Sequence, residues 1–266
     1  MTPDRPRRLV TIPISHYCEK ARWALDYTGV AFEERAHLQL LHRVAVRRAG
    51  GGTTAPVLVC GERVYADSAD ILSYANASAP SDRKLYPDDP EATAEIRALE
   101  AEYDERLGPH TRRWAYDLMR GRRDFARYIT PGVPGWQRRL LPASFRVVVK
   151  GIDRVLDIRP ETVVESAREV RLVFDAVAAR LDDGRPYLAG ERFTAADLTF
   201  SALAGPLVLP AEYGFGLPRL DELSGEAAAV VQEFRGHRAG EHALEMFARH
   251  RRSPSAAPAD AAASAS

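Results

Sequence analysis

The sequence predicts an α/β domain followed by an all-helical domain. Before about residue 79, short apolar runs alternate with amphipathic stretches, whereas after residue 90 apolar residues recur almost continuously at helical spacing. A stretch rich in proline and aspartate separates the two patterns. We therefore expect an α/β domain at 1–79, a linker at 80–90, a helical domain at 91–252 and, from its Ala/Ser/Pro composition, a disordered tail at 253–266.

The α/β part begins with an apolar run at 8–12, which predicts a strand, and continues with a helix at 17–28. Ala21, Ala24 and Leu25 lie on one stripe of this helix, and Gly29 is a stop signal. The turn between the two elements reads Ser15-His16-Tyr17-Cys18. A hydroxyl and a thiol at a helix N-terminus occupy a position that favours anions and thiolates, so this turn is the first candidate for a reactive site.

The next elements complete a small mixed sheet. The alternating stretch 30–37 predicts a second strand, parallel to the first because a helix connects them. The segment 38–48 is a short helix or an irregular basic stretch, and three glycines at 50–52 end it. Two apolar runs around Gly61-Glu62 predict a hairpin. Asp67-Ser68 then offers an N-cap for a helix at 69–75.

The rest of the chain is predicted to be helical. Residues 145–156 form a helix that either packs on a core or partner or lies on a membrane surface. Thr194 and Asp197 form a capping box before a buried helix at 198–203, and Pro206 and Pro210 should break or kink this region. The other predicted helices cover 91–107, 111–128, 161–181, 227–234 and 241–251.

Composition excludes several classes of protein. The 37 basic and 37 acidic residues give a net charge of +0, so a nucleic-acid partner is not expected. Two cysteines support neither a disulfide framework nor a zinc site, and they favour a reducing, cytoplasmic location. The N-terminus lacks the apolar core of a signal peptide, and no apolar run reaches the ~18 residues of a membrane span. Stable membrane insertion is therefore not expected.

Three motifs occur in order in the α/β part: Ser15-x-x-Cys18, Ala55-Pro56-Val57-Leu58 and Asp67-Ser68-x-x-Ile71-x-x-Tyr74. In this order and spacing they resemble the thioredoxin-like N-terminal domain of cytosolic glutathione transferases. The stretch 187–199 resembles the motif that starts the central buried helix of their C-terminal domain. The resemblance implies a glutathione transferase fold, glutathione as co-substrate, a small apolar electrophile as second substrate, a role in detoxification, a homodimer and no metal.

Catalytic roles follow from the first motif. Ser15 is the preferred partner of the glutathione thiolate, because its hydroxyl can donate a hydrogen bond to sulfur at a helix N-terminus; alternatively, it only caps the helix. Cys18 is the second catalytic candidate, as an attacking thiol, unless it faces the core as a small apolar residue. His16 and Tyr17 are candidates for contacts with glutathione, although His16 also fits a solvated turn histidine.

The resemblance implies how the other two motifs hold the peptide. Pro56 is expected to follow a cis peptide bond, and the backbone of Ala55 to pair with the cysteinyl backbone of glutathione. Asp67 is expected to pair with the γ-glutamyl ammonium, and Ser68 with its carboxylate. The family more often has glutamate at the position of Asp67. For the glycyl carboxylate the sequence offers several basic side chains without choosing among them: His42, Arg43, Arg47 and Arg48.

The second substrate is expected against the helical domain. Trp114 and Tyr116, with Trp136 and Tyr213, are candidates for an apolar pocket, although aromatic residues are also common in cores. Two other functions stay open: a non-catalytic ligand-binding or interaction protein on the same fold, and a thiol-disulfide reductase that uses Cys18. A different small thiol could also replace glutathione.

Overall fold

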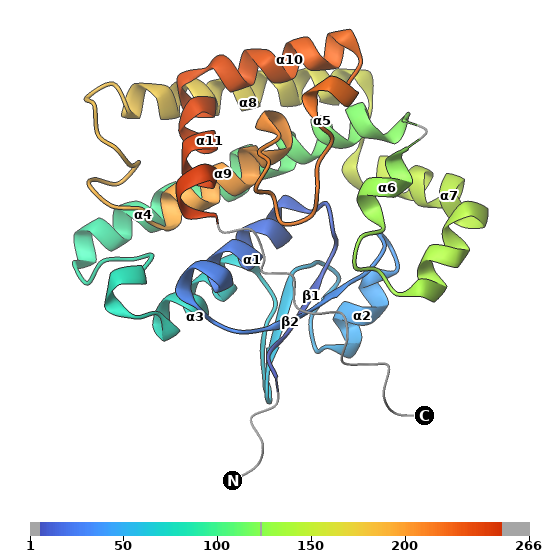
Figure 1. The fold of residues 1–266 in the computed structure, drawn as a ribbon, viewed down its shortest axis with the longest axis horizontal. Coiled ribbons are helices and arrows are strands. Elements are labelled where there is room, and N and C mark those ends of the chain that lie inside the picture. The colour runs from blue at the N-terminus through green and yellow to red at the C-terminus, as the bar shows by residue number, and fades with distance from the viewer. Residues whose placement is uncertain (1–5, 123, 252–266) are drawn as a thin grey trace.

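The computed structural model describes residues 6–122 and 124–251, so the tail predicted at 253–266 lies outside the described residues. An α/β unit comes first, and a helical unit lies over it (Figure 1). The elements of the α/β unit are β1 (Arg8–Thr11), α1 (His16–Thr28), β2 (Glu33–Ala36), α2 (His42–Arg48), β3 (Val57–Cys60), β4 (Arg63–Tyr65) and α3 (Ser68–Ser78).

The four strands form one sheet in the order β2-β1-β3-β4. Strand β1 runs parallel to β2, and β3 and β4 form a hairpin, as the sequence predicts. The structure adds that β1 pairs antiparallel with β3. Successive side chains of β1 point to opposite faces. Leu9 therefore belongs to the core that includes α1 and α3, whereas Val10 packs with Val46 of α2 on the other face. The two central strands, β1 and β3, are therefore mostly apolar, whereas the edge strand β2 is mostly charged.

The helical unit contains eight α-helices, three short helical turns of other types, and loops among the described residues. Their bounds are η1 (Ser81–Arg83), α4 (Pro90–Glu102), η2 (Tyr103–Leu107), α5 (Gly108–Arg120), α6 (Phe125–Ile129), α7 (Gly135–Leu156), α8 (Pro160–Arg180), α9 (Ala195–Val208), η3 (Leu220–Glu222), α10 (Gly225–Gly236) and α11 (Arg238–His250). The helix predicted at 111–128 is in fact two helices, α5 and α6. No helix of the described ranges is long and apolar enough to cross a membrane.

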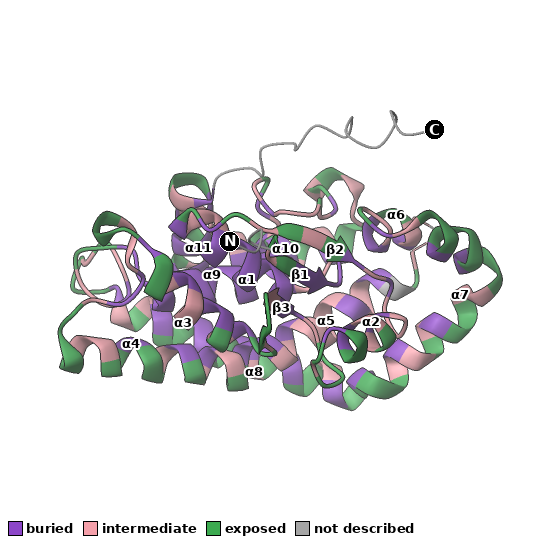
Figure 2. Cartoon of the chain, turned by 90° about the horizontal axis from the view of Figure 1, so that it is seen from below, coloured by how far each residue is buried: buried purple, intermediate pink, exposed green. Residues whose placement is uncertain are grey.

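Helix α9 is the centre of the helical unit, and every one of its residues is buried. Figure 2 shows this concentration of buried residues in α9 and α1, where the two units meet. The predicted capping box is present: Asp197 accepts hydrogen bonds from the backbone N–H of Thr194 at 3.0 Å and from its hydroxyl at 2.9 Å. Pro206 does not break the helix, which continues to Val208 and ends before Pro210, the second proline predicted to break or kink this region. Packing on all sides of α9 outweighs the one backbone hydrogen bond that a proline removes.

Helices α4 and α5 follow each other without a loop, joined by a five-residue π-helical turn, η2. Such turns add one residue to the helical repeat and are frequent at functional sites. Here the turn faces the start of α1. A second apolar core, separate from the one around α9, lies between α5, α6 and α7 and contains Phe125, Leu141 and Ile152.

Candidate functional site

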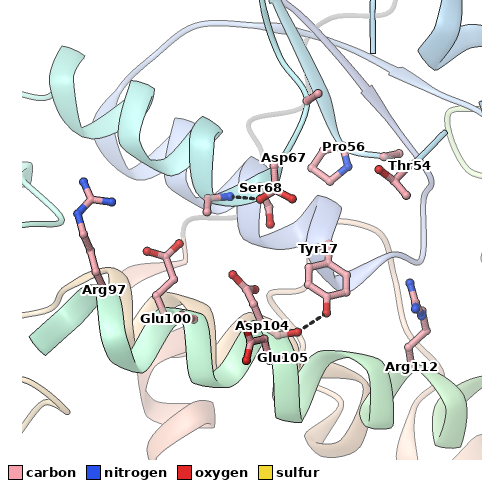
Figure 3. A pocket seen from close by; sticks show the side chains of 14 residues that line it. Tyr17, Thr54, Pro56, Asp67, Ser68, Arg97, Glu100, Asp104, Glu105 and Arg112 are labelled. Carbon is pink, nitrogen blue, oxygen red and sulfur yellow. Dashed lines mark hydrogen bonds between the residues drawn. The ribbon is translucent and has the colours of Figure 1, made fainter. Parts of the chain in front are cut away.

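A cleft of about 520 Å³ opens between the two units (Figure 3). One wall comes from the turn before β3 and from the start of α3, and the other comes from α4, η2 and α5. The volume lies within the range of small-molecule sites. The cleft brings together many of the residues predicted from the sequence: Tyr17, Ala55, Pro56, Asp67 and Ser68.

The start of α3 gives the cleft an anion-binding end. Asp67 caps the helix in an extended conformation, and its side chain accepts a hydrogen bond from the N–H of Ala69 at 2.8 Å. Ser68, the first residue of the helix, is buried against the cleft. The first N–H groups of a helix have no partner within it, and they carry its positive end. A carboxylate at this end therefore has donors from the backbone and from the Ser68 hydroxyl.

The peptide bond between Ala55 and Pro56 is cis, as the resemblance implied. Pro56 is buried and directly precedes β3, and Ala55 borders the cleft. Ala55 also lines a second, smaller cavity of about 110 Å³. Since Thr54 and Arg112 border both spaces as well, the cleft and the small cavity adjoin.

Ser15 lines the small cavity rather than the main cleft. It is the N-cap of α1, and its Oγ accepts a hydrogen bond from the N–H of Cys18 at 3.4 Å. Because that bond uses a lone pair, the hydroxyl proton stays available for a ligand. The structure therefore places a half-buried hydroxyl donor at the positive end of α1, beside Ala55.

Cys18 points away from this cavity into the core. Its side chain is fully buried, and its Sγ accepts a hydrogen bond from the N–H of Ile12 at 3.4 Å. Burial raises the pKa of the thiol, and the opposing effect of the Arg22 charge is smaller. The thiolate that a nucleophile requires is therefore disfavoured at this position.

His16 is buried, so the interpretation as a solvated turn histidine is wrong. Its side chain is 2% exposed, because α5 covers the first turn of α1. Burial lowers the pKa of His16 to about 3, and the charge of Arg112 contributes in the same direction. A backbone hydrogen bond at Gly108 raises the pKa, but its effect is smaller. The imidazole is therefore neutral at physiological pH. It lines the small cavity and a further apolar pocket, but not the main cleft.

Tyr17 forms part of the floor of the main cleft. Its hydroxyl donates a hydrogen bond to the backbone carbonyl of Asp104 at 2.8 Å, across the boundary between the units (Figure 3). Burial raises the pKa of the phenol far above its usual value. Gly108 makes this position possible, since a Cβ there would lie 2.1 Å from the Tyr17 hydroxyl oxygen. The Tyr17 hydroxyl is thus protonated, and it already donates its hydrogen bond to the protein backbone.

A buried ionic cluster lies beside the cleft. The Lys20 ammonium, which is fully buried, contacts Glu100 at 2.9 Å and Asp104 at 2.6 Å. Tyr86 donates a further hydrogen bond to Glu100 at 2.5 Å. Both carboxylates also line the cleft opposite Asp67 (Figure 3). The cluster ties α1 to the helix formed by α4 and η2, and it places two carboxylates on that wall of the cleft, which also carries Arg97 and Arg112.

Arg112 on α5 is a residue that the sequence analysis missed, as it missed Glu100 and Asp104 on the same wall of the cleft. It borders the main cleft, the small cavity and the apolar pocket. Its Nε is enclosed and has no hydrogen-bond partner among the described residues. In the sequence it belongs to an Arg112-Arg113 pair that looks like an ordinary charged helix face. The one local signal was Gly108-Pro109, an unusual pair inside a helical run, which follows the π-helical turn and begins α5.

The apolar pocket lies behind His16, between α5 and the chain after α9. Tyr116, Met119 and Pro206 line it, and it shares His16, Arg112 and Tyr116 with neighbouring spaces. Tyr116, which the sequence analysis proposed as a pocket residue, therefore lines this apolar pocket and the small cavity. Trp114 is not on any of these three cavities; it packs on Phe234 in the core because it faces away from the cleft on α5. Likewise Trp136 is exposed and Tyr213 is buried.

The four candidates for the glycyl carboxylate separate in the structure. His42 and Arg43 line the small cavity beside Thr53, whereas Arg48 borders a different cleft beside β1 and β2, and Arg47 is exposed and lines neither. Burial lowers the pKa of His42 to about 4, so Arg43 supplies the positive charge. In 6–122 and 124–251 no group of three or more His, Cys, Asp or Glu side chains could hold a metal ion.

Comparisons with known proteins agree with this geometry. Residues 9–83 match the sequence model of the glutathione S-transferase N-terminal domain, and residues 145–227 match that of the C-terminal domain. A structure of a glutathione S-transferase of Ceriporiopsis subvermispora, in complex with glutathione, is 16% identical with a TM-score of 0.62, and the match covers 95% of this chain and 100% of that one. No curated protein sequence matches the chain.

Two bacterial structures show the same fold. A glutathione S-transferase from Xanthobacter autotrophicus has a TM-score of 0.56 at 16% identity, with 91% of this chain and 93% of that chain covered. The beta-etherase LigF from Sphingobium sp. strain SYK-6 has a TM-score of 0.55 at 17% identity, with 90% and 98% covered. At such identities the likeness concerns the fold, and the chemistry has to be argued from the residues of this chain.

Proposed function

The chain belongs to the glutathione S-transferase family, and from this premise we propose that it binds glutathione and transfers its sulfur to a small apolar electrophile. One observation carries the proposal. Ser15, Ala55 and the Asp67-Ser68 pair, which come from three separate parts of the sequence, border two adjoining cavities. An elongated peptide with a carboxylate at one end and a thiol near its middle matches this arrangement.

The proposed pose follows from the charges along the cleft. The γ-glutamyl carboxylate lies at the N-terminus of α3, where Ser68 and the free N–H groups donate to it. The γ-glutamyl ammonium lies between Asp67 and Asp104, which face each other across the cleft. The cysteinyl backbone lies along Ala55, and the glycyl carboxylate lies near Arg43 in the small cavity.

Two groups of this chain stabilise the thiolate in the proposed complex. A free thiol with a pKa of about 8.5 is mostly protonated at neutral pH. The Ser15 hydroxyl donates a hydrogen bond to the sulfur and keeps its proton, and Arg112, which lines the same small cavity, adds a positive charge. Lowering the pKa by about 2 units requires about 2.7 kcal/mol of preferential stabilisation of the thiolate, which two such contacts can supply in an enclosed site.

The electrophile approaches the thiolate from the apolar side of the site, next to His16 and Tyr116. The pocket there holds only about 30 Å³, so a substrate has to widen it or bind at its mouth. The thiolate attacks its electrophilic carbon, a carbon–sulfur bond forms, and the leaving group departs with the bonding electron pair. Because His16 is neutral, it does not add charge to this pocket. The alternative in which Cys18 exchanges disulfides receives no support from the structure, since its thiol is buried and its pKa is raised.

Calorimetric titration with glutathione, together with conjugation of an aryl halide, tests the proposal. A Ser15→Ala variant is expected to bind glutathione with similar affinity but to lose about 10-fold in kcat/KM, the equivalent of about 1.4 kcal/mol, because Arg112 still supplies its share of the stabilisation. Ser224→Ala is the matched control, because Ser224 is the N-cap of α10 and lies outside the cleft. Unchanged activity in Ser15→Ala would remove its role. Glutathione binding without conjugation would favour a non-catalytic binding protein.

A further inference from the structure

Helix α7 has an apolar face that no described part of the chain covers. Its inner face is core: Leu141, Val148 and Ile152 are buried between α5 and α6. On the outside, Trp136 is 57% exposed, Leu140 53% and Val147 68%. These values matter because large apolar side chains are seldom exposed as a contiguous group unless the group binds something.

The exposed apolar side chains lie on one stripe along α7. At about 100° per residue, Trp136, Leu140 and Val147 lie within roughly 40° of one another, and this stripe is turned roughly 120° from the buried one. Helix α7 lies at the edge of the molecule in both overall views (Figures 1 and 2), so the stripe faces outward. It runs along about three turns of a 22-residue helix, which is long enough to lie flat on a surface.

A basic stripe lies directly beside the apolar one. Arg139, Arg146 and Lys150 are exposed and share another sector of the helix, and Arg138 and Arg154 are exposed as well. The only acidic residue of the helix is Asp153. Within the part of the chain that the structure describes, none of the five basic side chains forms an ion pair. An apolar stripe flanked by unpaired cations, with tryptophan at one end, is the pattern of helices that lie in the interface of a membrane.

We propose that the outer face of α7 docks on an anionic lipid surface. Trp136 and Leu140 enter the interface, and Arg139, Arg146 and Lys150 contact the headgroups. The charge argues for this occupant over a second copy of the chain, since pairing two α7 helices side by side would bring the basic stripes together. Docking of this kind is peripheral, in agreement with the lack of a spanning helix in the described ranges.

Vesicles of phosphatidylcholine with about one-third phosphatidylserine, compared with phosphatidylcholine alone, test the proposal on the full chain. The chain is expected to sediment with the anionic vesicles only, and less at high salt. The fluorescence of Trp136 should shift to the blue on binding. The other two tryptophans contribute little to such a shift, because Trp23 is fully buried and Trp114 packs on the core.

Variants separate the two components of the surface. Arg139→Gln, Arg146→Gln and Lys150→Gln together are expected to weaken vesicle binding about 100-fold, at about fivefold per charge, and Trp136→Ser should abolish the blue shift. The matched control combines Arg249→Gln of α11 and Leu172→Ser of α8, both exposed and away from α7. All these sites are exposed, and circular dichroism checks that the variants fold.

The possible outcomes divide clearly. Binding to anionic vesicles that the α7 variants lose and the control keeps supports the proposal. Equal binding to neutral vesicles, no binding at low salt, or binding that the α7 variants retain would overturn it. So would a dimer in light scattering that Trp136→Ser dissociates, because that result would assign the face to a second copy. Glutathione binding and conjugation do not depend on these residues, so the two proposals fail independently.

Discussion

Replacing Lys20 by methionine tests whether the ionic cluster beside the cleft holds the two units together. Methionine keeps the length and the apolar stem of lysine but removes the ammonium. Glu100 and Asp104 then lose the cation that lies 2.9 Å and 2.6 Å from them. The side chain of Glu100 is only 4% exposed and that of Asp104 22%, so water replaces the ammonium poorly.

The expected loss of stability follows from this burial. Removing one partner of a buried ion pair costs about 3–5 kcal/mol, because a charge stays buried without compensation. Because Asp104 is partly exposed, we expect a loss at the lower end of this range, about 3 kcal/mol. At about 2–4 °C for each kcal/mol in a chain of this size, the midpoint of thermal unfolding should fall by about 6–12 °C.

The loss should depend on pH in a definite direction. Burial, only partly offset by Lys20, already raises the pKa of Asp104 in the folded protein, and without Lys20 it rises further. A carboxyl group whose folded pKa exceeds its unfolded pKa stabilises the fold below the unfolded value and loses that contribution as pH rises. The deficit of Lys20→Met should therefore be small near pH 4 and grow towards neutral pH.

Thermal unfolding followed by circular dichroism between pH 4 and pH 8 measures this effect. The control is the triple variant Lys20→Met, Glu100→Gln and Asp104→Asn, which removes all three charges and should recover most of the loss. If Lys20→Met unfolds within about 1 °C of the unmodified chain at neutral pH, the cluster contributes no net stability. If the triple variant is no more stable than the single one, lost packing rather than uncompensated charge is the cause.

Three further predictions concern the turn that begins α1. Gly108→Ala should weaken glutathione binding without unfolding the chain, because the added Cβ would displace the Tyr17 hydroxyl. Calorimetric titration measures this loss, and Gly121→Ala, where an added Cβ meets no other atom, is the control. In native protein a thiol reagent should label Cys60, which is partly exposed, and reach Cys18 only after unfolding; labelling of both in native protein would contradict the burial of Cys18. The rate of conjugation should show no ionisation from His16 between pH 5 and pH 8, because its folded pKa is about 3; a limb near pH 6.5 that disappears in His16→Gln would contradict its burial.

Much of the fold could be predicted because local signals agree with the tertiary structure. The run at 8–12, the stop at Gly29 and the turn at Gly61-Glu62 locate elements that the structure contains. Thr194 and Asp197 also form the predicted capping box. At these positions the local conformational preference and the buried surface favour the same structure, so a single sequence is informative.

The site was less predictable, because it depends on how the helical unit sits on α1. Nothing in the local pattern shows that α5 covers His16, and the π-helical turn at Tyr103–Leu107 changes which residues of the helix face the cleft. Arg112 reaches the site only through that geometry. The exposed stripe on α7 was hidden for the same reason, since periodicity alone cannot tell which of two apolar faces is covered.

The four consecutive residues at the start of α1 show how the structure narrows the chemistry. Cys18 carries the stronger nucleophile, but burial raises its pKa and its sulfur faces the core. The Tyr17 hydroxyl already donates a hydrogen bond to the backbone carbonyl of Asp104, and His16 is neutral and enclosed. Ser15 alone of the four combines a free hydroxyl proton with a place on the small cavity beside Ala55. A weak acid that donates without ionising is suited to hold a thiolate, because the negative charge then remains on the sulfur of the substrate.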